Sequence, residues 1–218
     1  AYVATGGGTS GVSSLTLGYA TDANVNDFII LIVETNGNDT TVAISGWTHF
    51  PGSPVVDVAD ATGSKLNVLW RLRPTAGTTT VTVPDCGDHQ IARTCVFSGV
   101  ASNRTFVTAT DTKTTASTSV SWPALTTPSP NNVVFYVASR PDSSASTTAF
   151  SSFANANLTS VTELGEMGST SGSGGGFVFG YGVKAAVGST GNATATCTAS
   201  VTNALFAVAL EPAFALPA

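Results

Sequence analysis

Apolar and polar residues alternate along most of the chain, and a period of two is typical of β-strands whose faces meet different surroundings. No long stretch places apolar residues at the i, i+3, i+4 and i+7 positions of an amphipathic helix. We therefore expect an all-β protein with almost no helix. The expected strands are residues 13–19, 27–35, 41–47, 65–73, 78–83, 92–100, 117–122, 132–140, 158–164, 176–186, 192–199 and 205–212.

The second half of this pattern repeats the first. Residues 65–83, KLNVLWRLRPTAGTTTVTV, are echoed by residues 176–195, GFVFGYGVKAAVGSTGNATA. Two arrangements explain the repeat: two duplicated domains, or one sandwich to which each half contributes matching strands. The matching residues, 111 positions apart, are Leu66 and Phe177, Val68 and Phe179, Trp70 and Tyr181, Leu72 and Val183, Arg73 and Lys184, and Gly77 and Gly188.

The length of 218 residues allows one large all-β domain or two small ones. The best internal boundary, TTPSPNN at 126–132, follows a short strand that needs a partner. We therefore favour a single jelly-roll-like β-sandwich of two antiparallel sheets with an internal pseudo-repeat, in which the halves interleave and close most sheet edges. The expected parts are an N-terminal arm (1–12), the sandwich (13–212, with halves of about 13–125 and 126–212) and a C-terminal tail (213–218).

Composition limits the partners. Charged residues make up 10% of the chain, against about a quarter in typical domains, so the polar surface must come from Ser, Thr, Asn and Gly. The net charge is −5 and the eight Lys and Arg are scattered, which excludes the basic stripe that a nucleic-acid partner requires. No apolar run reaches the roughly 18 residues of a membrane span, so we expect no membrane insertion.

The chain has three cysteines, Cys86, Cys95 and Cys197, and an odd number argues against a disulfide framework. We expect small buried hydrophobic side chains. A Cys86–Cys95 bridge, or a bond between subunits, is the alternative.

The segment CGDH (86–89), together with His49, offers residue types that serve as nucleophiles or zinc ligands. A zinc site needs four ligands in paired spacings, and only Cys86 and His89 approach that pattern. The GxSxG nucleophile elbow is absent. We expect Asp85, Gly87 and Asp88 to shape a turn and His89 to cap its exit.

Two further segments suggest ligands only weakly. Asp57 and Asp60 lie in a Gly-containing loop but lack the alternating oxygen ligands of a calcium loop, so we expect a solvated loop. Residues 168–180 are Gly-rich, but neither GK[ST] nor a helix follows, which favours a flexible loop over a phosphate site. We expect no metal, no cofactor and no catalytic residue.

The tryptophans could form a platform on which a sugar stacks. Trp70 lies on the apolar face of its strand and Trp122 precedes Pro123 at a strand end, positions that indicate core packing. Trp47, beside His49, is the best candidate for an exposed aromatic side chain, although core packing is favoured there too. The weak ligand-binding candidates are therefore Trp47, His49, Asp88 and His89.

Several motifs resemble a β-sandwich domain of tailed-bacteriophage structural proteins and bacterial surface proteins. In the first half these motifs are NDFIILIVETNG, SGWTHF, KLNVLWRLRPTAGTTTVTV and DHQIARTCVFSGV. In the second half they are VVFYVASRPD, VKAAVGSTGNATATCTAS and FAVALEPA, so the resemblance covers residues from about 12 to 213. It implies a particle-building or adhesive module without chemistry. The motifs are core and turn positions, which identify a fold better than a function.

We therefore expect a non-enzymatic virion structural protein of a tailed bacteriophage, a capsid decoration or fibre-type module that stabilises or displays the particle surface. The alternative is a secreted carbohydrate-binding or adhesive module, outside the cell or on its surface, with a host-surface glycan as ligand. A groove lined by two or more exposed aromatic side chains would favour the alternative. A flat surface rich in Ala and Thr would favour the virion protein.

The expected partners are copies of the chain itself, as a trimer by analogy with decoration and fibre proteins, and other virion proteins. Few charges leave little electrostatic repulsion against self-association. Tyr2, Val3, Phe214 and Leu216 lie outside the expected strands, and we expect them to contact a neighbouring subunit. The alternative is that both tails fold back on their own sandwich.

Overall fold

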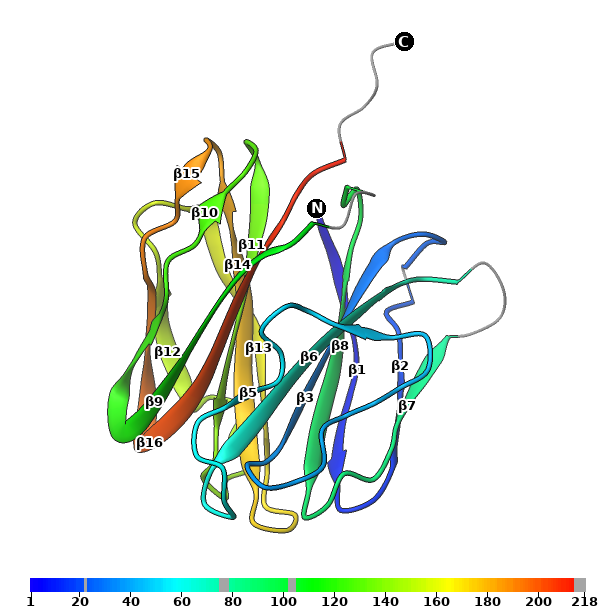
Figure 1. Ribbon diagram of the computed structural model, residues 1–218, viewed down its shortest axis with the longest axis vertical. Coiled ribbons are helices and arrows are strands. Elements are labelled where there is room, and N and C mark those ends of the chain that lie inside the picture. Colours follow the sequence, from blue (N-terminus) through cyan, green and yellow to red (C-terminus); the bar gives the residue numbers. More distant parts are fainter. Residues whose placement is uncertain (22, 75–78, 102–104, 214–218) are drawn as a thin grey trace.

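The computed structural model describes residues 1–21, 23–74, 79–101 and 105–213 (Figure 1). It is all-β, with more than half of the described residues in strands, and no helix among these residues could cross a membrane. The strands are β1 (Tyr2–Gly11), β2 (Leu15–Gly18), β3 (Phe28–Asn36), β4 (Thr48–His49), β5 (Val55–Val56), β6 (Ser64–Leu72), β7 (Thr80–Val83), β8 (Gln90–Phe97), β9 (Val107–Trp122), β10 (Thr126–Thr127), β11 (Asn132–Arg140), β12 (Phe150–Ala154), β13 (Thr159–Ser169), β14 (Gly175–Lys184), β15 (Gly188–Ser189) and β16 (Ala193–Leu210).

The strands form two large antiparallel sheets, which confirms the predicted β-sandwich. The first sheet has the order β1-β8-β3-β6-β4, with β5 also paired to β6. The second sheet has the order β12-β16-β11-β14-β13, with β9 also paired to β16. Two short ribbons, β2-β7 and β10-β15, complete the fold.

Each large sheet takes its strands from one half of the chain, so the prediction that the halves interleave is wrong. The boundary between the halves lies between Phe97 and Val107, rather than at residues 125 and 126. All the pairing partners of β9 lie in β16, which assigns residues 107–122 to the second half. Strands that follow one another in sequence commonly become neighbours in space, and here that tendency operates within each half.

A central core fills the space between the two sheets. Alternate residues of β3 face it, namely Phe28, Ile30 and Ile32, while the residues between them face the opposite side of the sheet. The same alternation places Phe135 and Val137 of β11 in the central core. Every β3 residue is buried, because both faces of this strand are covered.

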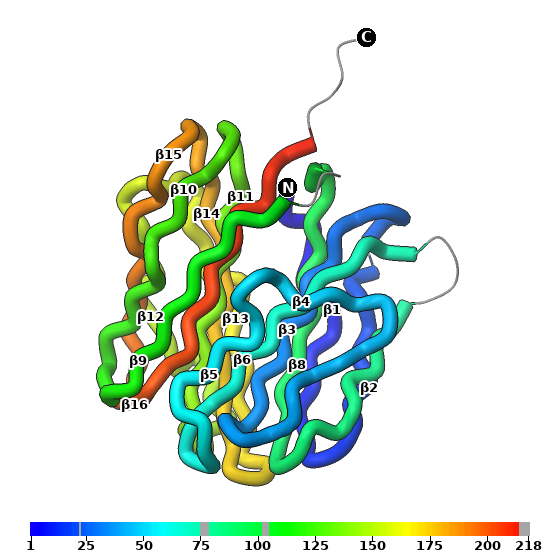
Figure 2. Tube along the Cα trace, in the orientation of Figure 1, coloured from blue at the N-terminus to red at the C-terminus, as the bar shows by residue number. Residues whose placement is uncertain are grey.

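An outer layer covers the far face of each sheet. In the first half it is the β2-β7 ribbon, and Leu15, Leu17, Val81 and Val83 face inward. In the second half, β9 and β16 bend together where their register shifts and fold back, together with β12, over their own sheet (Figure 2). Each half is thus a small two-layer unit with a core of its own. The inward-facing residues of the second outer layer include Val120, Trp122, Phe150, Ala193, Ala195 and Cys197.

Residues 2–11 form an edge strand of the first sheet, so the prediction of an arm over residues 1–12 is wrong. A run of three glycines is unusual in a strand, because glycine weakens strands. Here it allows close approach: a Cβ at Gly6 would lie 2.0 Å from Thr94 Oγ1 and 2.8 Å from the Ala20 nitrogen. Side chains at this point would force β1 away from the sheet.

Three smaller expectations have different outcomes. Residues 41–47 form no strand; the Val42 N–H donates to Asn67 Oδ1, and the Val42 carbonyl lies 2.8 Å from His49 Nε2. The Gly-rich segment 168–180 is mostly strand, with only residues 170–174 in a turn between β13 and β14. All three cysteines are free and buried, as predicted.

The central core should dominate stability. The Phe135 ring is fully buried and lies edge-on to Phe97, with centroids 5.6 Å apart, across the two sheets. Phe135→Ala should lower the free energy of unfolding by about 3–5 kcal/mol through lost burial and a cavity. Val187→Ala, at an exposed residue, should change it by less than about 0.5 kcal/mol. Urea unfolding of the two variants measures the difference, and equal effects would contradict this account.

Candidate functional site

Titratable residues meet at the end of the sandwich where β3 ends and β8 and β14 begin, toward the bottom of Figure 1. Glu34 lies near the end of β3, Asp88 and His89 immediately precede β8, and Ser173 lies in the turn before β14. The first three belong to the first half and Ser173 to the second. We call these four residues, together with Asn36, the carboxylate–histidine cluster.

His89 lies between two carboxylates. Its Nε2 is 3.1 Å from Glu34 Oε2, and its Nδ1 is 3.0 Å from Asp88 Oδ2. The side chains of His89 and Glu34 are essentially inaccessible, whereas that of Asp88 is 41% exposed. The cluster therefore extends from the sheet interface to the surface.

Ser173 joins the second half to this arrangement. Its backbone N–H and its hydroxyl both donate to Asp88 Oδ2, at 2.6 and 2.7 Å. Asn36 Nδ2 donates to the Ser173 hydroxyl oxygen at 2.8 Å. One exposed carboxylate oxygen thus fastens the turn before β14 to the first half.

The pKa values follow from burial and pairing. Burial raises the pKa of Glu34 to about 7, against the opposing effect of His89. Burial alone would lower the pKa of His89, but hydrogen bonds and charges from Glu34 and Asp88 outweigh it and raise this pKa to about 9. Hydrogen bonds from Ser173, and then from His89, lower the pKa of Asp88 to about 2. His89 is therefore protonated at neutral pH.

This arrangement does not suit nucleophilic catalysis. A general base needs a neutral imidazole nitrogen facing the hydroxyl that it activates. Both nitrogens of His89 face carboxylates, and although the Ser173 hydroxyl lies 3.4 Å from His89 Nδ1, it donates to Asp88 Oδ2 at the shorter distance of 2.7 Å. The cluster acts as a charged link between the two halves.

A glycine makes room for the buried carboxylate. A Cβ at Gly175, the first residue of β14, would lie 2.6 Å from Glu34 Oε2 and 2.7 Å from Glu34 Oε1. Cβ atoms in folded proteins essentially never approach so closely. Glu34 Oε1 is buried without a hydrogen-bond partner among the described residues. Glu34 therefore fills the space that a side chain at residue 175 would occupy.

The structure divides the four predicted ligand-binding residues. Asp88 and His89 belong to the cluster. Trp47 is 9% exposed in the first half's own core, where it contacts Tyr19 edge-on and lies 5.6 Å from the Arg71 guanidinium. The candidate sugar platform is therefore not present at Trp47.

His49 also has a local role. Its Nδ1 lies 3.0 Å from the Ser53 hydroxyl, and its Nε2 contacts the Val42 carbonyl. These bonds hold the segment that precedes β4 against the first sheet. Both ring nitrogens therefore bond to groups of neighbouring loop residues.

The turn residues behave largely as predicted. Gly87 donates its N–H to Asp85 Oδ1, and the Cys86 thiol, whose pKa burial raises to about 11, donates to the Pro84 carbonyl. The expectation that His89 caps this turn is wrong, because the His89 ring is buried between carboxylates. In the described ranges, no group of three or more His, Cys, Asp or Glu side chains is arranged so that it could hold a metal ion.

The Asp57 and Asp60 loop is only partly solvated, as Asp57 is buried. The Asp57 carboxylate accepts from the N–H groups of Val58 and Ser64, both at 2.6 Å. Asp60 accepts from Thr62. Each carboxylate thus stabilises its own loop.

Of the predicted subunit contacts, Tyr2 and Val3 pack within their own chain. The Tyr2 ring stacks on Tyr181 of the second half with centroids 5.6 Å apart, and Val3 packs against the core of the first half. Phe214 and Leu216 lie outside the described residues. The N-terminal segment thus follows the alternative in which it folds back on its own sandwich.

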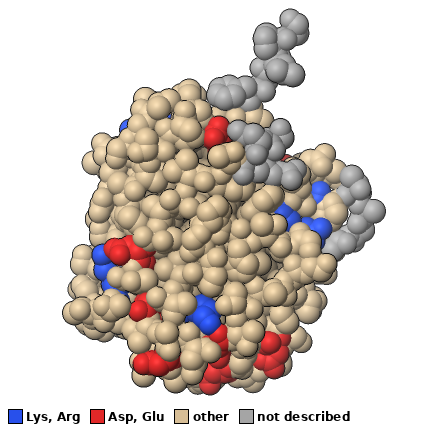
Figure 3. Space-filling view, viewed as in Figure 1, with Lys and Arg blue, Asp and Glu red and all other residues tan. Residues whose placement is uncertain are grey.

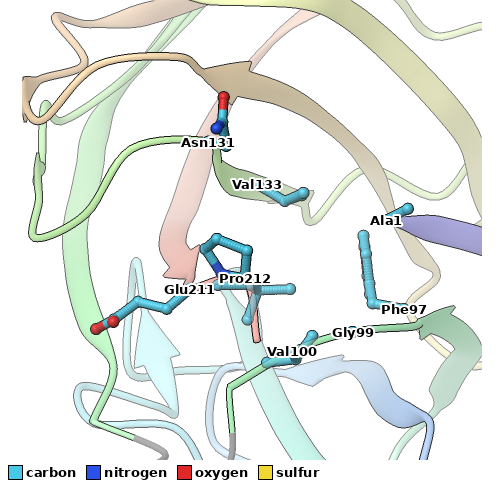
Figure 4. Close-up of a pocket in the computed structure, with 9 residues that line it drawn as sticks. Ala1, Phe97, Gly99, Val100, Asn131, Val133, Glu211 and Pro212 are labelled. Carbon is cyan, nitrogen blue, oxygen red and sulfur yellow. The ribbon is translucent and has the colours of Figure 1, made fainter. Parts of the chain in front are cut away.

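A small apolar hollow lies at the opposite end of the sandwich (Figure 4). It is formed where the ends of β8, β11 and β16 meet the first residue. Figure 4 shows the Glu211 side chain pointing away from the other lining residues. The lining residues are Ala1, Phe97, Gly99, Val100, Asn131, Val133, Leu210, Glu211 and Pro212.

Sequence reasoning missed Glu34, Asn36 and Ser173. Glu34 did carry a signal, since it is an acidic residue next to the apolar run 28–33, where burial is expected. Ser173 carried none, because one serine in a Gly- and Ser-rich turn resembles its neighbours. Its partner Asp88 is 85 residues away in the chain.

We compared the chain with known protein families, curated proteins and solved structures, and none of them matches.

The cluster makes stability depend on pH. Because the pKa values of Glu34 and His89 are raised, the folded chain binds more protons than the unfolded chain between about pH 5 and 9. The free energy of unfolding should therefore fall as pH rises through this range. The contribution of His89 is complete below its ordinary pKa of 6.5 and is lost as pH rises through about 9.

Urea unfolding at pH 5, 7 and 9 measures this slope. Glu34→Gln combined with His89→Gln removes both titrating groups and should flatten the slope between pH 5 and 9; His89→Gln alone would raise the pKa of Glu34 further. The matched control, His49→Gln, removes the only other histidine of the chain and should keep the slope. A slope that is unchanged by the double substitution would contradict the assignment.

Proposed function

We propose that this chain is a non-enzymatic structural protein of a tailed-bacteriophage virion, of the capsid decoration or fibre type. The observation that carries the proposal is an exposed face of uncharged side chains on the outer layer of the second half. We call it the hydroxyl face, and it consists of Ser119 and Ser121 of β9, Ser151 of β12, and Thr194, Thr196 and Thr198 of β16.

Strand pairing arranges these side chains in rows. Thr196 lies opposite Ser119 on one side and Ser151 on the other, and Thr194 lies opposite Ser121. The intervening residues Ala193, Ala195 and Cys197 point into the core beneath. All members of the face are exposed except Ser121, which is partly buried.

Such a face suits docking on a large, regular partner. Hydroxyl groups donate and accept hydrogen bonds, so the face can contact a second protein without transferring charge out of water. The supporting sheet is bonded on both sides of β16, which keeps the rows in place. Charged residues are also sparse over much of the surface seen in Figure 3, where they gather toward its lower end and sides.

The interior supports the same proposal. Glu34 and His89 form the buried part of the carboxylate–histidine cluster. This cluster links the two halves and does not face a substrate. Trp47 and Trp122 are buried, so stacking of a sugar on these rings has no support. We therefore place the interaction surface on the exterior of the sheets and prefer the virion protein to the carbohydrate-binding module.

The partners proposed are other virion proteins and further copies of the chain. The resemblance noted in the sequence supports both, and so does the low content of charged residues. The location that follows is the virion surface.

Charged substitutions on the hydroxyl face should abolish docking. Ser119→Lys combined with Thr196→Lys places two like charges side by side in the middle of the face. The purified wild-type chain should co-sediment with virions assembled without it, and the double variant should bind at least tenfold less. The matched control is Thr16→Lys with Thr82→Lys, an exposed pair that also lies side by side, on the outer layer of the first half.

Melting curves must show that both double variants fold. Particle binding that is equal for wild type and both variants would exclude the hydroxyl face. No co-sedimentation of the wild-type chain with heads or tails would overturn the virion proposal itself.

Self-association should depend on the C-terminal segment. We expect light scattering to show a trimer for the whole chain and a monomer for a chain ending at Ala213, because the removed residues include Phe214 and Leu216, the remaining predicted subunit contacts. A monomer for both chains would contradict the proposed oligomer. A trimer for both would place the subunit contacts elsewhere.

A further inference from the structure

The repeat seen in the sequence is present residue by residue in the structure. Trp70 pairs with Ile30 in the first sheet, and their matched residues, Tyr181 and Phe135, pair with each other in the second sheet. The order β8-β3-β6 in the first sheet corresponds to β16-β11-β14 in the second. The two halves are therefore copies of one folding unit.

The outer layers correspond as well. β9 combines the roles of β1 and β2, and β16 combines those of β7 and β8. Leu17 pairs with Val81 beneath the outer face of the first half, as Trp122 pairs with Ala193 in the second. The correspondence thus includes both layers of each half.

Most contacts between the halves are reciprocal; the exception is β6 with β16, which has no equally extensive counterpart between β14 and β8. β6 contacts β11, as β14 contacts β3; β5 contacts β16, as β13 contacts β8; and β5 contacts β9, as β13 contacts β1. Reciprocal contacts of this kind characterise an isologous interface, in which the same patch of two subunits meets across a two-fold axis. The halves pack like the subunits of a symmetric dimer.

One pair of reciprocal contacts breaks the symmetry. Glu34 of β3 lies against Gly175 of β14. The matched residues are Ser139 of β11 and Ser64 of β6, and their hydroxyls are 2.6 Å apart and buried. The interface thus has a carboxylate on a glycine at one point and two serines at the equivalent point.

This difference determines which halves fit together. Two first halves would place Glu34 against Ser64, where a Cβ and a hydroxyl occupy the space that the carboxylate needs. Two second halves would place Ser139 against Gly175 and leave a void, which costs stability. Only the combination of unlike halves leaves space for the Glu34 carboxylate and keeps its bond to His89.

We propose that the inner face of each half is a protein-binding surface whose partner is the inner face of the other half. The chain is a covalently joined heterodimer of two related β units, and Glu34 on Gly175 specifies the pairing of unlike halves. This proposal is independent of the virion function, since it concerns how the two halves recognise each other.

A cycle of substitutions in the whole chain tests the specifying contact. Gly175→Ser should lower the melting temperature by several degrees, because Glu34 must move and lose His89. Glu34→Ser should lower it through loss of the same link. The double variant reproduces the serine pair of the reciprocal contact. Its loss of melting temperature should be smaller than the sum of the losses in the two single variants.

Two controls separate this explanation from simpler ones. Gly18→Ser introduces the same side chain at a strand glycine whose Cβ would approach other atoms no closer than 3.8 Å, and it should change the melting temperature little. Glu34→Ala with Gly175→Ser relieves the clash without a second hydroxyl, and it should melt below the double serine variant. Additive losses in the cycle would overturn the role of Glu34 and Gly175.

A cleaved chain tests the partner surface. A protease site that replaces residues 102–104, between β8 and β9, allows the folded chain to be cut into its halves. The cut protein should elute at the size of the intact chain. After unfolding in urea and dilution, the fragments should recombine one to one.

The same cut in the double serine variant should allow like halves to pair as well, and native mass spectrometry distinguishes the three dimers. Halves that separate in native buffer after cutting would overturn the proposed binding surface. Wild-type halves that pair at random would overturn the pairing specificity.

Discussion

The burial of one apolar face of each sheet against the other is the interaction on which the rest of this structure depends. Phe28, Ile30 and Ile32 of β3 meet side chains of the second half, including Phe135 and Phe206, in a core from which water is excluded. Neither sheet could leave this face exposed, because large contiguous apolar patches on a soluble surface associate or aggregate. The outer layers then need to cover only one face of each sheet. The reciprocal contacts between the halves follow from the repetition of one strand pattern along the chain.

The polar cluster at one end of this core complements the apolar burial. A buried carboxylate is costly unless it is paired, and Glu34 is paired with a histidine that is itself held by Asp88. Non-polar packing tolerates many arrangements of similar volume, whereas a charged hydrogen-bonded pair needs its partners in place. The cluster therefore contributes to the specificity of how the halves meet more than to the strength of their contact. It leaves interaction with other molecules to the exterior, where the hydroxyl face lies.

The sequence predicted strands well where alternation was strong and poorly where other demands overrode it. Residues 132–140 were predicted as a strand and form β11 with these same limits. Residues 1–12 were predicted as an arm because they lie outside the obvious strand patterns, yet residues 2–11 form β1, and close packing against Thr94 requires glycine at residue 6. Residues 41–47 alternate but form no ladder, since their backbone bonds to side chains of Asn67 and His49. In the cluster, Asp88 and His89 were singled out from their residue types, but their buried partner Glu34 and their distant partner Ser173 were not.

The sequence by itself determined the all-β class, the internal repeat and the alignment of Trp70 with Tyr181. These features depend on local periodicity and residue type, which every short segment carries. Only the tertiary structure decided that each half forms its own sheet, that Trp47 is buried and that a carboxylate lies on Gly175. These depend on which distant segments come together. The pattern of alternation is the same whether matching strands interleave in one sheet or separate into two, because alternation specifies which faces are buried and not which strand covers them.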